Sequence, residues 1–135
     1  MKKNSGAVAI LALLLAPLAA DGHHSLSAVY DQSRRVSVEA LVVEFHFVNP
    51  HPYLLADVRG ADGATVRWRL EIDNRRELTA IGITDETWKP GDRIVASGSP
   101  DRKGESALYA WSIDRPRDRF RYEQVGGTPR IVPPR

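Results

Sequence analysis

The sequence predicts a small, mainly β domain, and three observations predict it. Apolar and polar residues alternate through residues 36–48 and 66–72, which is the period of a strand with one buried face. Turn signals separate such runs, among them Asp62-Gly63, a typical hairpin pair. Helix-capping residues precede only one short stretch, at Asp73 and Asn74.

The first expected strand, Val36–Val48, exceeds the usual length of about 5–6 residues, so we expect it to bend. It ends at Asn49-Pro50-His51-Pro52, where two prolines cannot donate to a sheet ladder. This segment is therefore an edge, a bulge or a corner. Further strands are expected at residues 53–58, 66–72, 93–98 and 107–113.

A single helix is expected over Arg75–Ile81, before Gly82. The order of three strands, one helix and two strands favours a five-stranded, partly open Greek-key barrel of the oligonucleotide/oligosaccharide-binding (OB) type. The helix lies between strands three and four, which favours this barrel over a generic β-sandwich. The large side chains expected in the core include Val66, Trp68, Leu70, Ile72, Trp88 and Trp111.

The first 22 residues have the three-part layout of a secretory signal peptide, with a basic start, an apolar run at residues 7–15 and small residues after it. The apolar run is too short for a membrane span of about 20 residues. Cleavage after Ala20 or after Gly22 is expected, and the second site fits the small-x-small rule better. We therefore expect a periplasmic or secreted protein.

The chain divides into four expected parts. Residues 1–22 form the signal peptide, 23–35 a polar leader, 36–122 the OB-like barrel, and 123–135 a flexible tail rich in Gly and Pro. No second apolar run could form a transmembrane anchor after signal cleavage.

Composition excludes several classes of protein. The chain has 19 Lys and Arg against 17 Asp and Glu. Because Lys2 and Lys3 leave with the signal, 17 remain against 17 after cleavage at Ala20, and against 16 after cleavage at Gly22, which also removes Asp21. Nothing therefore indicates a nucleic-acid partner. The absence of Cys excludes a thioether-linked lipid anchor, a disulfide framework and a thiolate metal site. No catalytic motif is present, so no catalytic residue is assigned.

The His23-His24 pair is the sharpest candidate for a metal site. Cleavage after Gly22 makes His23 N-terminal, so that its amine and ring chelate one ion and a further imidazole completes a three-nitrogen copper site. Cleavage after Ala20 creates Asp21-Gly22-His23, whose amine, amides and ring form a square-planar chelate suited to Cu(II) or Ni(II). The alternative is a polar leader whose histidines bind nothing specific.

His51 is the candidate for the further imidazole, because the prolines on both sides hold its ring in a fixed direction. Alternatively, Asn49 bonds the turn and His51 packs at the barrel rim. His46 alternates away from Phe45 and Phe47, and a solvated surface histidine is expected there.

Five stretches together resemble the bacterial domain of unknown function 6152 family: His23-His24-Ser25, Tyr30-Asp31, residues 44–51 with Asn49-Pro50-His51, Trp68, and Lys89-Pro90-Gly91-Asp92. The resemblance covers about residues 23–113 and implies an exported small β-barrel. It places His23, His24, Asn49 and His51 on the polar motifs of the family, whereas Trp88 stands where the family pattern has Leu. It implies no activity, because the family has none established.

We therefore expect an exported binding module that captures a transition metal, with copper as the preferred cofactor. The rival hypothesis is a metal-free periplasmic module that binds a protein or a saccharide. A third hypothesis is a small oxidative enzyme with an N-terminal copper site.

Overall fold

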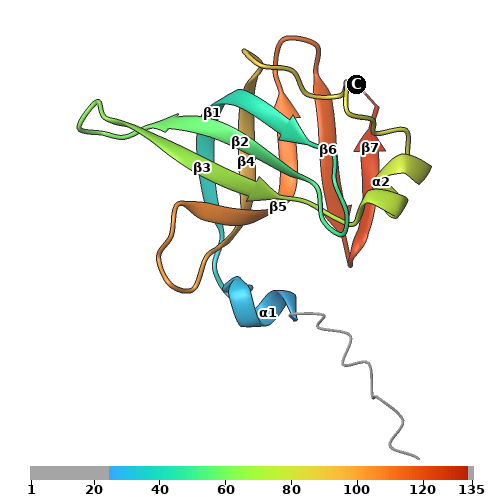
Figure 1. Ribbon diagram of the computed structural model, residues 1–135, viewed down its shortest axis with the longest axis horizontal. Coiled ribbons are helices and arrows are strands. Elements are labelled where there is room, and N and C mark those ends of the chain that lie inside the picture. Colours follow the sequence, from blue (N-terminus) through green and yellow to red (C-terminus); the bar gives the residue numbers. More distant parts are fainter. Residues whose placement is uncertain (1–24, 134–135) are drawn as a thin grey trace, which may run out of the picture.

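The computed structural model describes residues 25–133, in which short helices flank a barrel of antiparallel hairpins (Figure 1). The helices are α1 (Leu26–Val29) and α2 (Arg75–Ala80). The strands are β1 (Val36–His46), β2 (Tyr53–Arg59), β3 (Thr65–Glu71), β4 (Arg93–Pro100), β5 (Ala107–Arg115), β6 (Phe120–Val125) and β7 (Thr128–Val132).

The first five strands close into a barrel. Antiparallel pairing joins β3 to β2, β2 to β1, β1 to β4 and β4 to β5. A short parallel pairing of Arg69–Glu71 with Ala107–Tyr109 then joins β3 to β5 and completes the circle. Because α2 lies between β3 and β4, the predicted five-stranded barrel with one inserted helix is confirmed, and it is closed rather than partly open.

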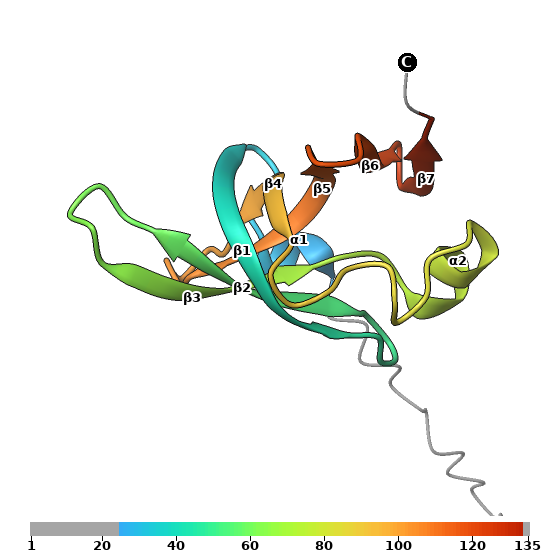
Figure 2. The same ribbon diagram turned by 90° about the horizontal axis from the view of Figure 1, so that it is seen from above.

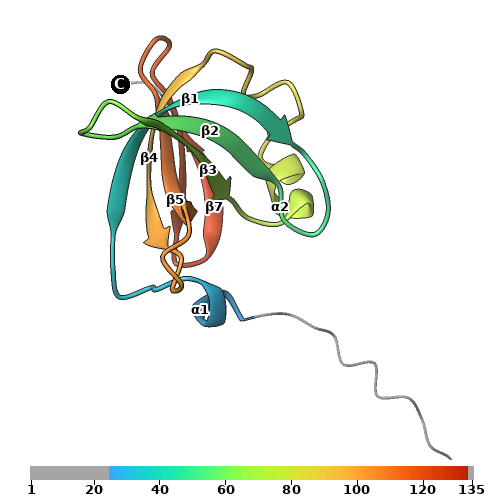
Figure 3. The same cartoon turned by 60° about the vertical axis from the view of Figure 1, so that its left-hand side comes forward.

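The long strand β1 bends, as expected, because it belongs to two pairings. Its residues Val36–Leu41 pair with β4, and Ala40–His46 pair with β2. A register shift between Val42 and Glu44 marks a β-bulge on the second pairing. A bulge adds one unpaired residue and increases the local twist, so the strand curves over the barrel (Figure 3).

A second bulge lies at Ser97 and Gly98, where β4 meets β5. A Cβ atom added at Gly98 would lie 2.0 Å from the carbonyl oxygen of Tyr109. Glycine is therefore required at this position by the close approach of the two backbones.

Trp88, which is 1% exposed, lies at the centre of an aromatic group in the core. Its ring meets those of Phe45, Phe120 and Tyr122 edge to face, with centroids 5.0, 5.7 and 6.1 Å apart. Aliphatic side chains from the barrel and its connections complete the core: Val42, Leu54, Leu70, Ile72, Leu78, Ile83, Ile94, Leu108 and Ile113.

The prediction for the core was wrong at the first half of β3. Val66 is 44% exposed, and Trp68 is only partly buried, as is Trp111 on β5. The cause is topological: β5 pairs with β3 only from Arg69 onward, so the start of β3 projects with the end of β2 as a free hairpin (Figures 1 and 2).

The expected flexible tail over residues 123–135 is also corrected. Residues 128–132 form β7, which pairs in register with β6, and β6 in turn pairs with Ser112–Arg115 of β5. Tyr122 and the following strand therefore extend the sheet beside the barrel. A composition rich in Gly and Pro is typical of a tail, but Gly126 and Gly127 have positive φ and form the hairpin turn.

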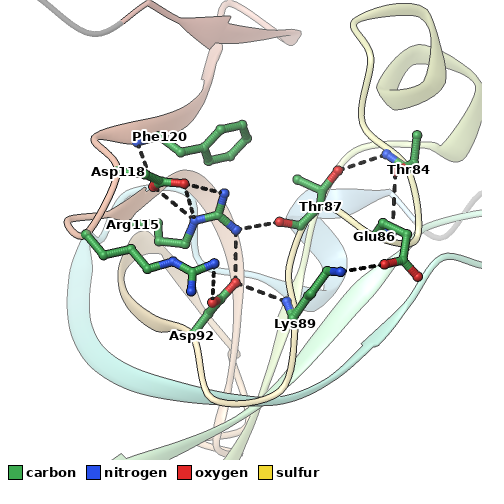
Figure 4. A network of polar contacts seen from close by, with 9 residues as sticks. Thr84, Glu86, Thr87, Lys89, Asp92, Arg115, Asp118 and Phe120 are labelled. Carbon is green, nitrogen blue, oxygen red and sulfur yellow. Dashed lines mark hydrogen bonds and ion pairs between the residues drawn. The ribbon is translucent and has the colours of Figure 1, made fainter.

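The Lys89–Asp92 turn is held by its last side chain, which is 2% exposed (Figure 4). The Asp92 carboxylate accepts hydrogen bonds from the Lys89 backbone N–H at 3.0 Å and from Arg115 at 2.9 Å. Arg117 lies 2.9 Å from its other oxygen. This motif is therefore structural, because it holds the turn that leads into β4.

The Arg115 guanidinium is the buried partner in this network and is 8% exposed. It makes bonds of 2.9–3.1 Å to both oxygens of Asp118 and donates to the Thr87 carbonyl at 2.5 Å. A buried charge needs such partners because desolvation is costly. Arg115, the last residue of β5, is thus a buried structural side chain.

Candidate functional site

The corner between β1 and β2, residues 49–52, is held by the end of β3 and the start of α2. The Asn49–Pro50 peptide bond is cis. The Pro50 carbonyl accepts from the Arg75 backbone N–H at 3.2 Å, and the Pro52 carbonyl accepts from that of Ile72 at 3.0 Å. These bonds fix the backbone on both sides of residue 51.

The imidazole of His51 is half-buried at this corner. Its Nδ1 lies 3.2 Å from the backbone carbonyl oxygen of Ile72. A carbonyl oxygen can only accept a hydrogen bond, so this bond requires a proton on Nδ1. In the neutral ring, Nε2 then carries the lone pair, and this is the arrangement in which metal-binding histidines are usually held.

Asn49 and His46 are not held in the way that His51 is. Asn49 is exposed at the corner. His46 is not the solvated side chain expected from the sequence: its side chain is 27% exposed, and its ring stacks on that of Tyr53 with centroids 4.5 Å apart. Its Nε2 is buried and lies 3.0 Å from a carboxylate oxygen of Glu44 without making a hydrogen bond.

The candidate ligands His23 and His24 lie outside the described residues. The polar leader that follows them is partly helical, since it contains α1. The β4–β5 turn holds this segment through Arg102, whose backbone N–H donates to the Val29 carbonyl at 2.9 Å and whose Nε donates to that of Ser27 at 2.7 Å. The start of the described chain is thus attached to the barrel.

Tyr30, directly after α1, makes a second attachment. Its ring is 4% exposed, and its hydroxyl donates to Glu71 at 2.8 Å. Glu71 is the last residue of β3 and precedes Ile72, whose carbonyl holds His51. The N-terminal segment therefore contacts the last residue of β3, and the proline corner contacts the residue after it. In the ribbon, α1 lies below the barrel and the corner lies beside α2 (Figures 1 and 3).

A buried polar network begins at Asp73, the residue after Ile72. The Asp73 carboxylate, 7% exposed, accepts from Gln124 at 2.9 Å and from the Asn74 backbone N–H at 2.7 Å. Gln124 accepts in turn from the Tyr109 hydroxyl at 2.9 Å. Burial raises the pKa of Asp73, and burial followed by the nearby carboxylates of Asp73 and Glu71 raises that of Tyr109.

Sequence reasoning missed Tyr30, Glu71 and Arg102 as residues that shape this region. The spacing of Glu71 and Asp73 was a usable signal, because residues two apart in an extended segment share a face. The contacts of Tyr30 and Arg102 depend on how the leader folds back, which no local pattern indicates. Gln124 lies in β6, where the Gly- and Pro-rich composition predicts a tail and gives no sign of a buried contact.

Among residues 25–133, no three His, Cys, Asp or Glu side chains are gathered closely enough to hold a metal ion. In the same part of the chain, no helix is both long and apolar enough to cross a membrane.

Comparison with known proteins gives one finding. A model of a family of unknown function (DUF6152) matches residues 11–109, which include the leader, the proline corner and the Lys89–Asp92 turn. No curated protein matches the chain.

Proposed function

The chain belongs to the family of unknown function DUF6152, and we propose that it is an exported small β-barrel that captures a transition metal, copper in preference. The proposed ligands are the N-terminal amine, the ring of His23 and the Nε2 atom of His51, with His24 as an alternative donor. Export follows from the signal-like residues 1–22, and cleavage there creates the N-terminal amine.

The carrying observation is the hydrogen bond between His51 and Ile72. It fixes the ring and leaves Nε2 as the nitrogen that can accept a metal. A ring already held in place loses little conformational entropy when it binds an ion, so binding is stronger than to a free side chain. The Nε2 atom of His46, by contrast, is buried and lies 3.0 Å from a Glu44 carboxylate oxygen without making a hydrogen bond.

The described chain begins at Ser25, two residues after His23. It is bonded through Tyr30 to Glu71, which precedes Ile72, the residue whose carbonyl bonds His51.

Nitrogen ligands without a thiolate favour copper, because copper has the highest affinity among the divalent metals of the first transition row for such donors. Ligation needs neutral imidazoles, and a free imidazole protonates near pH 6.5. Copper affinity is therefore expected to fall as the pH is lowered below about 6.5.

The first experiment establishes the terminus. The full chain is expressed in a Gram-negative host, and the protein outside the cytoplasm is examined by N-terminal sequencing and intact mass. Loss of 20 or 22 residues is expected from the two cleavage sites. Full-length protein retained in the cytoplasm would contradict export.

The second experiment is a calorimetric Cu(II) titration of the processed protein beside a form with extra residues before His23. The extension converts the amine into an amide, so it is expected to weaken binding greatly. Equal affinity in both forms, or affinity no greater than that of a free histidine-containing peptide, would reject the proposal. The metal-free module would then be the better hypothesis.

His51→Ala and His46→Ala form a matched pair for the same titration, because both rings are partly buried and lie near the same corner. The first change is expected to lower copper affinity by about 10–100-fold, and the second to leave it nearly unchanged. Equal effects of the two changes would show that neither ring is a specific ligand.

A further inference from the structure

We propose that the protein forms a symmetric dimer in which the free edge of β3 pairs with the same edge of a second copy. This edge consists of Thr65, Val66 and Arg67, on the hairpin of β2 and β3 that projects from the barrel (Figures 1 and 2). The inference uses no residue of the proposed copper site and does not depend on copper binding.

The backbone groups of this edge are oriented by the part of β3 that is already paired. The Arg69 N–H points away from β2, because it donates to the Ser106 carbonyl at 3.0 Å. The pairing of β2 with β3 has no register shift, and residues two apart in such a strand point their N–H and C=O groups the same way. Thr65 and Arg67 therefore direct both groups away from β2, where no strand of residues 25–133 pairs with them.

The outer edge of β7 differs, because this strand contains Pro129. Proline has no N–H, and inside a sheet it is confined to positions whose N–H would face away from the ladder. The edge of β7 therefore lacks a donor that an added strand needs, and such a proline is one of the devices that protect sheet edges. The edge of β3 contains no proline, so all its donors and acceptors are present.

The symmetric register with its two-fold axis at Val66 uses every free group of this edge. In an antiparallel pair, two residues that point toward each other exchange two hydrogen bonds. This register places Thr65 opposite Arg67 of the second copy, and Arg67 opposite its Thr65, so the two pairs form four hydrogen bonds. An axis at Arg67 places two guanidinium groups opposite each other and requires Arg69, whose N–H is already bonded to Ser106.

The side chains on both faces of the hairpin suit this register. On one face, Val66 is 44% exposed and meets Val66 of the second copy, with Cα atoms about 4.5 Å apart in a pair of this kind. Trp68 lies on the same face, is only partly buried and adds apolar surface. On the other face, Asp57 neutralises Arg67, with 2.6 Å between Oδ1 and Nε, so no unpaired charge enters the contact.

The contact is smaller than that of a permanent dimer, because it is confined to a few residues of one edge. Small interfaces are typical of weak and reversible association. We therefore expect a dimer that dissociates on dilution, with a Kd above about 1 μM.

The first test is sedimentation equilibrium of protein purified after expression of the full chain, over about 5 μM to 1 mM, where a monomer–dimer equilibrium is expected. Thr65→Pro removes one donor from each copy but leaves the pairing with β2 intact, because this N–H faces outward. The loss of two hydrogen bonds is expected to raise the Kd by about tenfold or more.

Val66→Lys places like charges across the axis and is expected to weaken the dimer in the same way. Val125→Lys is the matched control, because Val125 is also an exposed valine near a hairpin turn but lies on β6. The control is expected to leave the Kd unchanged.

A cysteine at the axis tests the register directly, because the unaltered chain has no Cys. Cα atoms about 4.5 Å apart lie within the range of about 4.4–6.8 Å that a disulfide spans. Under oxidised glutathione, with a chelator to remove metals, Val66→Cys is therefore expected to form a disulfide-linked dimer about tenfold or more faster than Val125→Cys. This conservative variant keeps the inference testable if Val66→Lys or Thr65→Pro does not fold.

The inference is overturned if the unaltered protein stays monomeric at about 1 mM, or if Val66→Cys links no faster than Val125→Cys. The edge would then be open to an extended segment of another protein. A dimer that persists unchanged in Thr65→Pro and Val66→Lys would place the contact on another surface and would overturn the inference equally. None of these outcomes depends on whether the protein binds copper.

Discussion

Replacement of Asp92 by Ala is expected to be among the most destabilising single changes in this barrel. The carboxylate is 2% exposed and serves three partners: the Lys89 backbone N–H, Arg115 and Arg117. Removal of one partner from a buried ion pair costs about 3–5 kcal/mol, because the remaining charge is left desolvated. Asp118 still pairs with the arginine side chain, so the lower end of this range applies to Arg115.

Loss of the acceptor for the Lys89 N–H adds about 1 kcal/mol, as for a capping residue. The total is therefore about 4 kcal/mol, which is a large part of the roughly 5–15 kcal/mol by which domains of this size are stable. Asp92→Asn keeps a side-chain oxygen for one donor and should cost clearly less.

The assay is urea denaturation followed by fluorescence, to which the buried Trp88 contributes. Asp57→Ala is the matched control, because Asp57 also pairs with an arginine, Arg67, at 2.6 Å, but at the surface. An exposed pair contributes about 0–1 kcal/mol. If Asp92→Ala cost no more than Asp57→Ala, the interpretation of the Lys89–Asp92 turn as a buried structural network would be refuted.

Three further predictions concern the fold. Gly98→Ala should destabilise the protein by about 3 kcal/mol, the upper end for overpacking, because the new methyl would collide with a backbone carbonyl; a thermal melt like that of the unaltered protein would contradict this. The hydrogen bond from Arg115 lowers the pKa of Asp118. The contribution of the Asp118 carboxylate to stability is therefore present above the pKa of the unfolded state, near 4, and is lost as the pH falls through the pKa of the folded state. In denaturant titrations, the difference in stability between the unaltered protein and Asp118→Asn should shrink below about pH 4, and a constant difference would contradict this prediction. Burial raises the pKa of three of the four tyrosines: Tyr30, Tyr109 and Tyr122. Absorbance titration should therefore show these side chains ionising only well above about pH 10. Their contribution to stability begins to be lost as the pH rises above the pKa of an unfolded tyrosine, about 10.

Local sequence patterns predicted the barrel because each strand has its own alternation of apolar and polar residues. The segments between the strands contain residues typical of turns. The bend of β1 and the single helix at Arg75–Ala80 followed from strand length and from capping by Asn74, whose side chain accepts from the Glu77 N–H at 3.0 Å. Alternation failed at Val66, because a period-two pattern identifies a face but not whether another strand covers it.

The candidate site was predictable only in part. The two prolines correctly indicated a rigid corner at His51, but not the backbone carbonyl that orients the ring. The contacts of Tyr30 with Glu71 and of Gln124 with Asp73 join residues 41 and 51 positions apart. Such pairings depend on tertiary closure, and a single sequence without aligned relatives gives no direct sign of them.

The hairpin of β6 and β7 shows that a sequence family and a folding unit need not end at the same residue. The matched region stops at residue 109, within β5, whereas Tyr122 and Gln124 come later and complete the core and the buried network. A protein cut at the family boundary would lose two thirds of β5 and would expose Trp88 and Asp73 to water. Transfer of this domain into another protein should therefore carry the chain through Val132, where β7 ends.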